Sequence, residues 1–236
     1  IIFGEYADER KYCGIGIVFF LMIRRPPRST LLQTREIISF TVSRLIEKSL
    51  KENVTHIEIR CSPINYTRGG LTGKGVLNVI LNSIEKYSDK ISVSLLIIAS
   101  RHGKMSDIYR HIELVDEMKN DDLFTKYFRG FDLAGDESKR NPAELRNAFL
   151  AVMESCSNIT IHAGETVKAK NIWEAVYHLN AERIGHGLTL ENDNSLMIKI
   201  LDRNIGIEMC PSSNFKIVGF RDNYYPESGK YAEYPL

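Results

Sequence analysis

Apolar residues along most of the chain follow two alternating spacings. From about residue 35 onward, stretches with helical periodicity alternate with short apolar runs of the kind found in buried strands. The predicted helices lie near 37–50, 76–87, 106–118, 142–153, 172–179 and 196–201, and the predicted strands near 56–59, 91–99, 128–133, 158–162, 184 and 205–209. Strands that alternate with helices are typical of a parallel sheet with helical crossovers, which predicts the α/β class.

Two architectures share this alternation, a doubly wound open sheet and a closed eight-stranded barrel. Periodicity does not separate them. The pattern contains six strand–helix units, two fewer than a complete (β/α) barrel. At 236 residues with 43% hydrophobic content, the chain is long enough for one domain with a large core.

The first 34 residues do not show the alternation of predicted helices and strands that the rest of the chain shows. An apolar run at 15–23 precedes the basic, proline-containing stretch at 24–28. The run is shorter than the roughly 20 residues that span a bilayer. The basic residues follow the run, whereas a signal peptide carries its basic residues before the apolar part. The letters FFLMIRRPPRSTLL resemble translated sequencing-adapter DNA. We therefore predict an atypical, artefactual segment over 1–34 and a partial barrel domain over 35–236. A native N-terminal arm is the alternative.

Charge and cysteine content exclude several function classes. The net charge of +1 gives no bulk attraction to nucleic acid or to an anionic membrane. The four cysteines, Cys13, Cys61, Cys156 and Cys210, are far apart and form no C-x-x-C pair. This spacing suggests neither a disulfide framework nor a thiolate zinc site. A reducing, cytoplasmic setting is expected, and the sequence indicates no oligomeric state.

Polar residues collect at the carboxyl ends of the predicted strands, where parallel α/β folds carry their active sites. His162 ends an apolar strand, and a neutral imidazole in such a place is a good zinc ligand. Glu165 follows after a turn, which would let its carboxylate face a substrate. His186 lies between two glycines, and a histidine near a bound hydroxide can orient it and help take its proton.

Each of these residues also has a structural interpretation when taken alone. His162 could be a hydrogen-bonded strand-end residue, and Glu165 a helix-start carboxylate favoured by the helix dipole. His186 and Gly135 could both be turn residues. Only their occurrence together, at the ends of neighbouring strands, favours a catalytic site.

Four segments in order carry a more specific signal. They are GFDLAGDE at 130–137, HAGE at 162–165, RIGHG at 183–187 and EMCPSSN at 208–214. Together they resemble the adenosine deaminase family. The resemblance implies a TIM-type (β/α) barrel, a catalytic Zn²⁺ and a purine nucleoside substrate. The implied reaction is the hydrolytic deamination of adenosine, or of 2'-deoxyadenosine, with release of ammonia.

The resemblance also implies a role for each matching position. His162 matches a zinc ligand, and Glu165 matches the acid that protonates N1 of the purine. His186 matches the histidine that orients the zinc-bound hydroxide. Gly135 matches the glycine whose backbone N–H meets the purine ring.

The chain departs from the family pattern in two places. It contains no His-x-His pair, which supplies two zinc ligands in the family, and no Thr-Asp-Asp-Pro-like strand end. The polypeptide as written is therefore expected to bind zinc poorly and to be inactive alone. Two alternatives stay open: a deaminase of adenine, AMP or N6-modified AMP, and a non-catalytic barrel that has lost its metal site.

Overall fold

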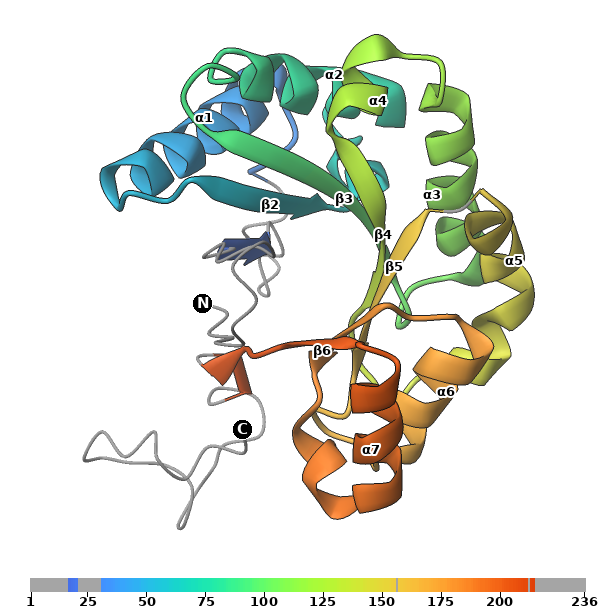
Figure 1. Ribbon diagram of the computed structural model, residues 1–236. Coiled ribbons are helices and arrows are strands. Elements are labelled where there is room, and N and C mark those ends of the chain that lie inside the picture. The colour runs from blue at the N-terminus through green and yellow to red at the C-terminus, as the bar shows by residue number, and fades with distance from the viewer. Residues whose placement is uncertain (1–16, 21–30, 156, 212, 215–236) are drawn as a thin grey trace. The chain divides into compact units, whose positions relative to one another are not determined.

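The computed structural model describes residues 17–20, 31–155, 157–211 and 213–214. Its contacts divide the chain into two compact units, one that ends at Asp132 and one that begins at Leu133. The division falls inside strand β4 (Phe128–Ala134). Within each unit, parallel strands alternate with helices (Figure 1). The predicted α/β class is therefore confirmed.

The first unit is built on parallel strands that precede β4. They are β1 (Ile17–Phe20), β2 (His56–Cys61) and β3 (Ser92–Ser100). Strand β2 pairs in parallel with both β1 and β3, so that Ile57 stands opposite Ile17 on one side and Val93 on the other. Every residue of β3 from 93 to 99 is buried. Such a continuous apolar run is what a parallel strand covered on both faces requires.

The helices of the first unit begin at side-chain caps where the sequence provides them. They are α1 (Arg35–Lys51), the 3₁₀ turn η1 (Pro63–Tyr66), α2 (Gly73–Glu85), α3 (Met105–Met118) and α4 (Asp122–Tyr127). The hydroxyl of Thr72 accepts a hydrogen bond from the backbone N–H of Gly75 at 3.0 Å. The Asp121 carboxylate accepts one from Phe124 at 2.9 Å. Both residues are favoured helix caps because they satisfy amide groups that the helix itself leaves unpaired.

The second unit repeats the same alternation. Its strands are β5 (Asn158–Ala163), β6 (Arg183–His186) and β7 (Gly206–Glu208), and its helical elements are η2 (Pro142–Leu145), α5 (Arg146–Glu154), α6 (Lys170–His178), η3 (Leu188–Asn192) and α7 (Asn194–Asp202). Strand β6 pairs in parallel with β5 and with β7. The three carboxyl ends therefore point the same way, which places the polar residues that follow them at one edge of this sheet.

Most predicted elements are confirmed, and the described residues add β1, α4 and the 3₁₀ turns η1 and η3. Strand β1 forms inside the segment that the sequence analysis set apart, and its residues Ile17 to Phe20 include no histidine. Helix α4 was not predicted because its six residues are too few to show a period. None of the helices that the structure describes is long and apolar enough to cross a membrane.

A buried histidine in α3 makes the stability of the first unit depend on pH. His111 is 2% exposed, and its Nδ1 lies 2.6 Å from the carbonyl oxygen of Asp107. Its Nε2 has no hydrogen-bond partner among the described residues. Burial lowers the pKa of His111, because the charged form loses its hydration; the neighbouring Asp107 opposes this only in part.

The unfolded state therefore binds more protons than the folded state once the pH falls below the ordinary histidine pKa. We expect the free energy of unfolding to decrease from about pH 7.5 to about pH 5.5, and His111→Leu to remove part of that slope. Urea unfolding at several pH values measures it. His102→Gln, at an exposed position, is the matched control and should keep the wild-type slope. Equal slopes for His111→Leu and the wild type would contradict this account.

Candidate active site

The ends of β5 and β6 bring two histidines together. In the parallel register, His162 stands opposite Gly185, and Ala163 stands opposite His186. A side chain at position 185 would place its Cβ 3.1 Å from Cγ of His162, so this glycine leaves room for the imidazole. The two histidine rings meet edge to face, with centroids 5.1 Å apart and an interplanar angle of 64°. Both side chains are buried.

The backbone at His186 is in the left-handed region. Its φ is 73°, and Gly187 follows with φ 65°. The N–H of Gly187 donates to the carbonyl oxygen of Ala163 at 3.0 Å, which ties this turn to the end of β5. A non-glycine residue with positive φ is uncommon, and such strained positions cluster at functional sites. The surrounding contacts thus hold His186 in a conformation that the isolated chain would rarely adopt.

His186 forms a cluster with two other polar side chains, those of Glu165 and Asn214. Its Nδ1 lies 3.5 Å from Oε1 of Glu165, and both side chains are less than a tenth exposed. The side-chain amide of Asn214 lies against both groups, with Nδ2 at 3.0 Å from Glu165 Oε1 and 2.8 Å from His186 Nδ1. Asn214 itself is fully buried. A carboxyl group and an imidazole held this closely can exchange or share protons with a bound molecule.

Glu137 holds the turn that carries Glu165. Its buried carboxylate accepts hydrogen bonds from the backbone N–H groups of Glu165, at 3.1 and 3.2 Å, and of Thr166, at 3.2 Å. Gly135 lies two residues before it, directly after β4, with φ 105°. Such a φ is readily adopted only by glycine. The loop after β4 is therefore tied to the loop after β5 through a buried charge.

Gly164 makes that turn possible, and its replacement should be costly. Its φ is 76°, and a Cβ there would lie 2.5 Å from Cδ1 of Ile172. We expect Gly164→Ala to lower the free energy of unfolding by about 2–4 kcal/mol, from left-handed backbone strain plus overpacking. Gly70→Ala is the matched control, because Gly70 also has positive φ but no atom within 4 Å of the added Cβ. Urea unfolding should show a smaller loss for the control, and equal losses would refute the packing argument.

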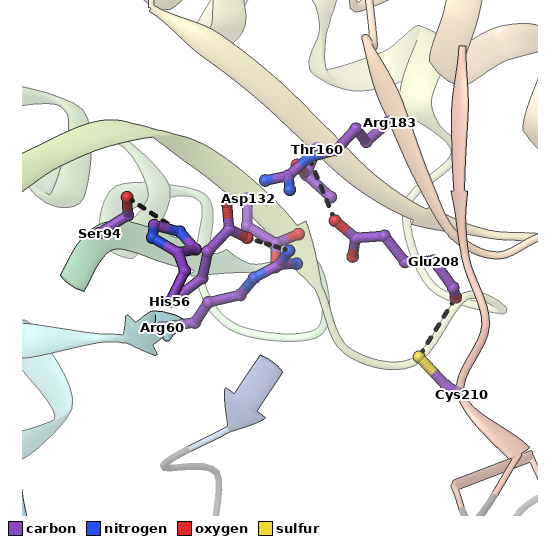
Figure 2. A network of polar contacts seen from close by, with 9 residues as sticks. His56, Arg60, Ser94, Asp132, Thr160, Arg183, Glu208 and Cys210 are labelled. Atoms are coloured by element: carbon purple, nitrogen blue, oxygen red, sulfur yellow. Dashed lines mark hydrogen bonds and ion pairs between the residues drawn. The ribbon is translucent and has the colours of Figure 1, made fainter. Parts of the chain in front are cut away.

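An ion pair and a hydrogen bond, both made by the partly exposed Arg183, link the three strands of the second unit. Nε of Arg183 on β6 lies 3.2 Å from Thr160 Oγ1 on β5 and 3.2 Å from Glu208 Oε1 on β7 (Figure 2). Cys210 adds a contact from its thiol to the carbonyl oxygen of Glu208 at 3.3 Å. These contacts fix the start of the segment that ends in Asn214.

A completely buried ion pair lies in the first unit. Arg60 on β2 donates through Nη1 to Asp132 Oδ2 at 2.9 Å, and both side chains are completely buried (Figure 2). Nη2 of the same guanidinium reaches Glu58 Oε2 at 3.2 Å. Buried charges of this kind persist only when they are paired. The pair joins β2 to the strand that leads to Gly135.

Comparison with known proteins gives the site its context. A sequence model described as adenosine deaminase matches residues 25–224, which is most of the chain. The chain belongs to the adenosine deaminase family. The adenosine deaminase of Clostridium perfringens is 34% identical over 208 residues, covering 87% of this chain and 59% of that protein. The chain thus spans about three fifths of the length of this relative.

Solved structures of deaminase-type enzymes share the fold. The adenine deaminase from Arthrobacter aurescens superposes with a TM-score of 0.72 at 22% identity, covering 83% of this chain and 59% of that one. An amidohydrolase from Burkholderia ambifaria, solved with bound zinc, also has a TM-score of 0.72, at 18% identity, covering 80% and 52%. These similarities confirm the predicted TIM-type (β/α) barrel, of which this chain forms part.

The family resemblance implies a zinc ion. The described part of the chain does not contain a complete set of ligands for it. No three His, Cys, Asp or Glu side chains there are grouped so that they could hold a metal ion. Zinc sites in enzymes use three protein ligands plus water. His162 accounts for one ligand at most, and the other described residues do not fit a zinc site.

The structure brings together three of the four predicted site residues, His162, Glu165 and His186, while Gly135 is linked to them through the loop that Glu137 anchors. Sequence reasoning assigned no role to Glu137 or Asn214. Both follow predicted strands, among the polar residues that collect there, and both lie inside the quoted motifs GFDLAGDE and EMCPSSN; these two signals could have drawn attention to them.

Proposed function

We propose that this member of the adenosine deaminase family supplies the acid–base part of a site that hydrolyses adenosine or 2'-deoxyadenosine to the inosine product and ammonia. The observation that carries the proposal is the buried cluster in which Glu165, His186 and Asn214 lie within 3.5 Å of one another. Because the chain spans about three fifths of its C. perfringens relative, the activity is proposed for the protein together with any sequence that flanks it.

The proposed roles are those that the family resemblance implies, and they fit the chemistry of the reaction. Water adds to C6 of the purine, a proton reaches N1, and the C6–N bond breaks to release ammonia. Glu165 would hold the proton and deliver it to N1, and His186 would orient the attacking water. The N–H of Gly135 would donate to the purine ring. His162 is the proposed ligand from this chain for a zinc ion whose other ligands the described residues do not supply, and such an ion would lower the pKa of a bound water toward neutral pH.

Adenosine is preferred over adenine as the proposed substrate because of the relative identities. The similarity to the C. perfringens adenosine deaminase, at 34%, exceeds that to the adenine deaminase structure, at 22%. A non-catalytic barrel is disfavoured for an energetic reason. Burying the ionisable side chains of Glu165 and His186 costs free energy, and an inert protein has no evident use for such a cluster. AMP and N6-modified AMP remain comparison substrates.

The test uses the chain together with any coding sequence that its gene carries on either side of residues 1 and 236. The purified protein is supplied with zinc and offered adenosine, 2'-deoxyadenosine, adenine, AMP and N6-methyl-AMP, and ammonia release is measured. The highest kcat/KM is expected for adenosine. Higher kcat/KM for adenine or a nucleotide would reassign the substrate, and no ammonia from any of them would overturn the proposal.

We also propose a cytoplasmic setting. Cys61 and Cys210 are free thiols, and burial raises the pKa of Cys61 to about 12, so that this thiol stays protonated and unreactive. Reduced cysteines are the rule in the cytosol. Fractionation of the source cells with an antibody to the protein tests the location.

A further inference from the structure

Asn214 lies at the centre of the cluster, although no role for it follows from the deaminase chemistry described above. Its side chain is fully buried. Its amide nitrogen lies within hydrogen-bonding distance of both Oε1 of Glu165, at 3.0 Å, and Nδ1 of His186, at 2.8 Å. A side-chain NH₂ group has two hydrogens, so it can donate to both partners at once.

This double contact determines where the proton of the neutral imidazole resides. Nδ1 of His186 can accept a hydrogen bond only through its lone pair, so the ring hydrogen must be on Nε2. The opposite orientation of the amide would place the carbonyl oxygen of Asn214 against Oε1 of Glu165, which is an acceptor in the carboxylate and also in the acid form whose proton is on Oε2, where it is available for N1 of the purine. Two acceptors would then face each other in a buried site, which is unfavourable.

We propose that Asn214 is a positioning residue that fixes His186 in the Nε2–H tautomer and holds the Glu165 carboxyl group beside it. His186 then presents a hydrogen-bond donor to a bound molecule at Nε2 and orients it by donation. The contribution to catalysis rests on the proposed deaminase function. The tautomer itself depends only on the geometry of Asn214, Glu165 and His186.

The tautomer can be measured directly on the full chain. Long-range ¹H–¹⁵N correlation spectra of protein labelled at histidine, recorded near pH 8 where imidazoles are neutral, distinguish Nδ1–H from Nε2–H. The His186 signals are those lost in His186→Gln. We expect an unprotonated Nδ1 and a protonated Nε2 in the wild type. Asn214→Asp replaces the donor with an acceptor of the same shape, so the Nδ1–H form should become dominant.

Two further variants complete the test. Asn214→Ala removes both contacts and should give a mixture of tautomers, and it stands in if Asn214→Asp does not fold. Asn192→Asp, at an exposed position in η3, is the matched control and should leave the His186 signals unchanged. An Nδ1–H tautomer in the wild type, or a tautomer that is the same in the wild type, Asn214→Asp and Asn214→Ala, would overturn the proposal.

Activity provides a second, separable readout. In the protein that carries its flanking sequence, Asn214→Ala should lower kcat about tenfold to a hundredfold with KM changed much less, as expected for misplaced catalytic groups. An unchanged kcat would refute the positioning role. If the wild type itself deaminates none of the purines, the proposed function fails, while the spectra still decide the tautomer.

Discussion

Replacing Glu165 by glutamine is expected to lower kcat for adenosine deamination by about 10²–10⁴-fold, the usual contribution of a general acid. Glutamine keeps the shape of the side chain and an oxygen that can accept the hydrogen bond from Asn214, at 3.0 Å in the wild type. It carries no proton that it can release to N1 of the purine. KM should change little, because binding contacts are kept while the proton transfer is lost. Initial rates of ammonia release measure both constants.

Glu191→Gln provides the control for this substitution. Glu191 lies on the exposed surface of η3 in the same unit, so the same chemical change occurs there away from the cluster. Its kcat should equal that of the wild type. Melting temperatures of both variants show whether the fold is kept. A folded Glu165→Gln protein with kcat within about threefold of the wild type would remove Glu165 from the proposed role, since general acid catalysis is worth far more.

The largest expected effect on stability comes from the buried pair in the first unit. Asp132→Asn should lower the free energy of unfolding by about 3–5 kcal/mol, because it leaves the guanidinium of Arg60 without its carboxylate partner in a dry environment. Arg60 and Asp132 are both completely buried, 2.9 Å apart. The Glu58 carboxylate, 3.2 Å from Nη2 of Arg60, still compensates part of the guanidinium charge. The loss of stability should therefore lie toward the lower end of that range. Urea unfolding followed by circular dichroism measures the loss.

Two comparisons separate pairing from packing. The double variant Arg60→Met with Asp132→Leu removes both charges and should recover most of the lost stability, as apolar replacements of buried ion pairs often do. Glu47→Gln breaks an exposed ion pair with Arg44, whose atoms are 2.9 Å apart, and should cost less than about 1 kcal/mol. The interpretation is wrong if Asp132→Asn costs no more than Glu47→Gln.

Much of the fold could be predicted from the sequence, because long periodic segments such as α1 and the fully buried β3 carry their own signal. Two elements could not. Helix α4 has six residues, too few to show a helical period. Strand β1 lies inside the apolar run at 15–23, which the basic, adapter-like letters after it set apart from the predicted barrel domain. The division of the chain inside β4 also has no signature in composition, since it depends on which contacts form after folding.

The candidate site was predictable only in part. The strand ends pointed to His162, Glu165 and His186, and the motifs gave these residues and Gly135 their implied roles. Asn214 contacts His186 and Glu165 only because folding brings together residues that are 28 and 49 positions apart in the sequence. A single asparagine beyond the last predicted strand gives no hint of these contacts. The same holds for Glu137, whose carboxylate accepts hydrogen bonds from backbone N–H groups that lie 28 and 29 residues further along the chain.

The left-handed backbone at residue 186 restricts how this site can evolve. Few side chains other than glycine tolerate φ near 73°, and asparagine, aspartate and histidine are the types most enriched there. A mutational path that exchanges the imidazole for another functional group must therefore pass through this small set, whatever the volume of the neighbouring space. New chemistry in this fold would more readily arise at position 165 or 214, where backbone geometry sets no comparable limit.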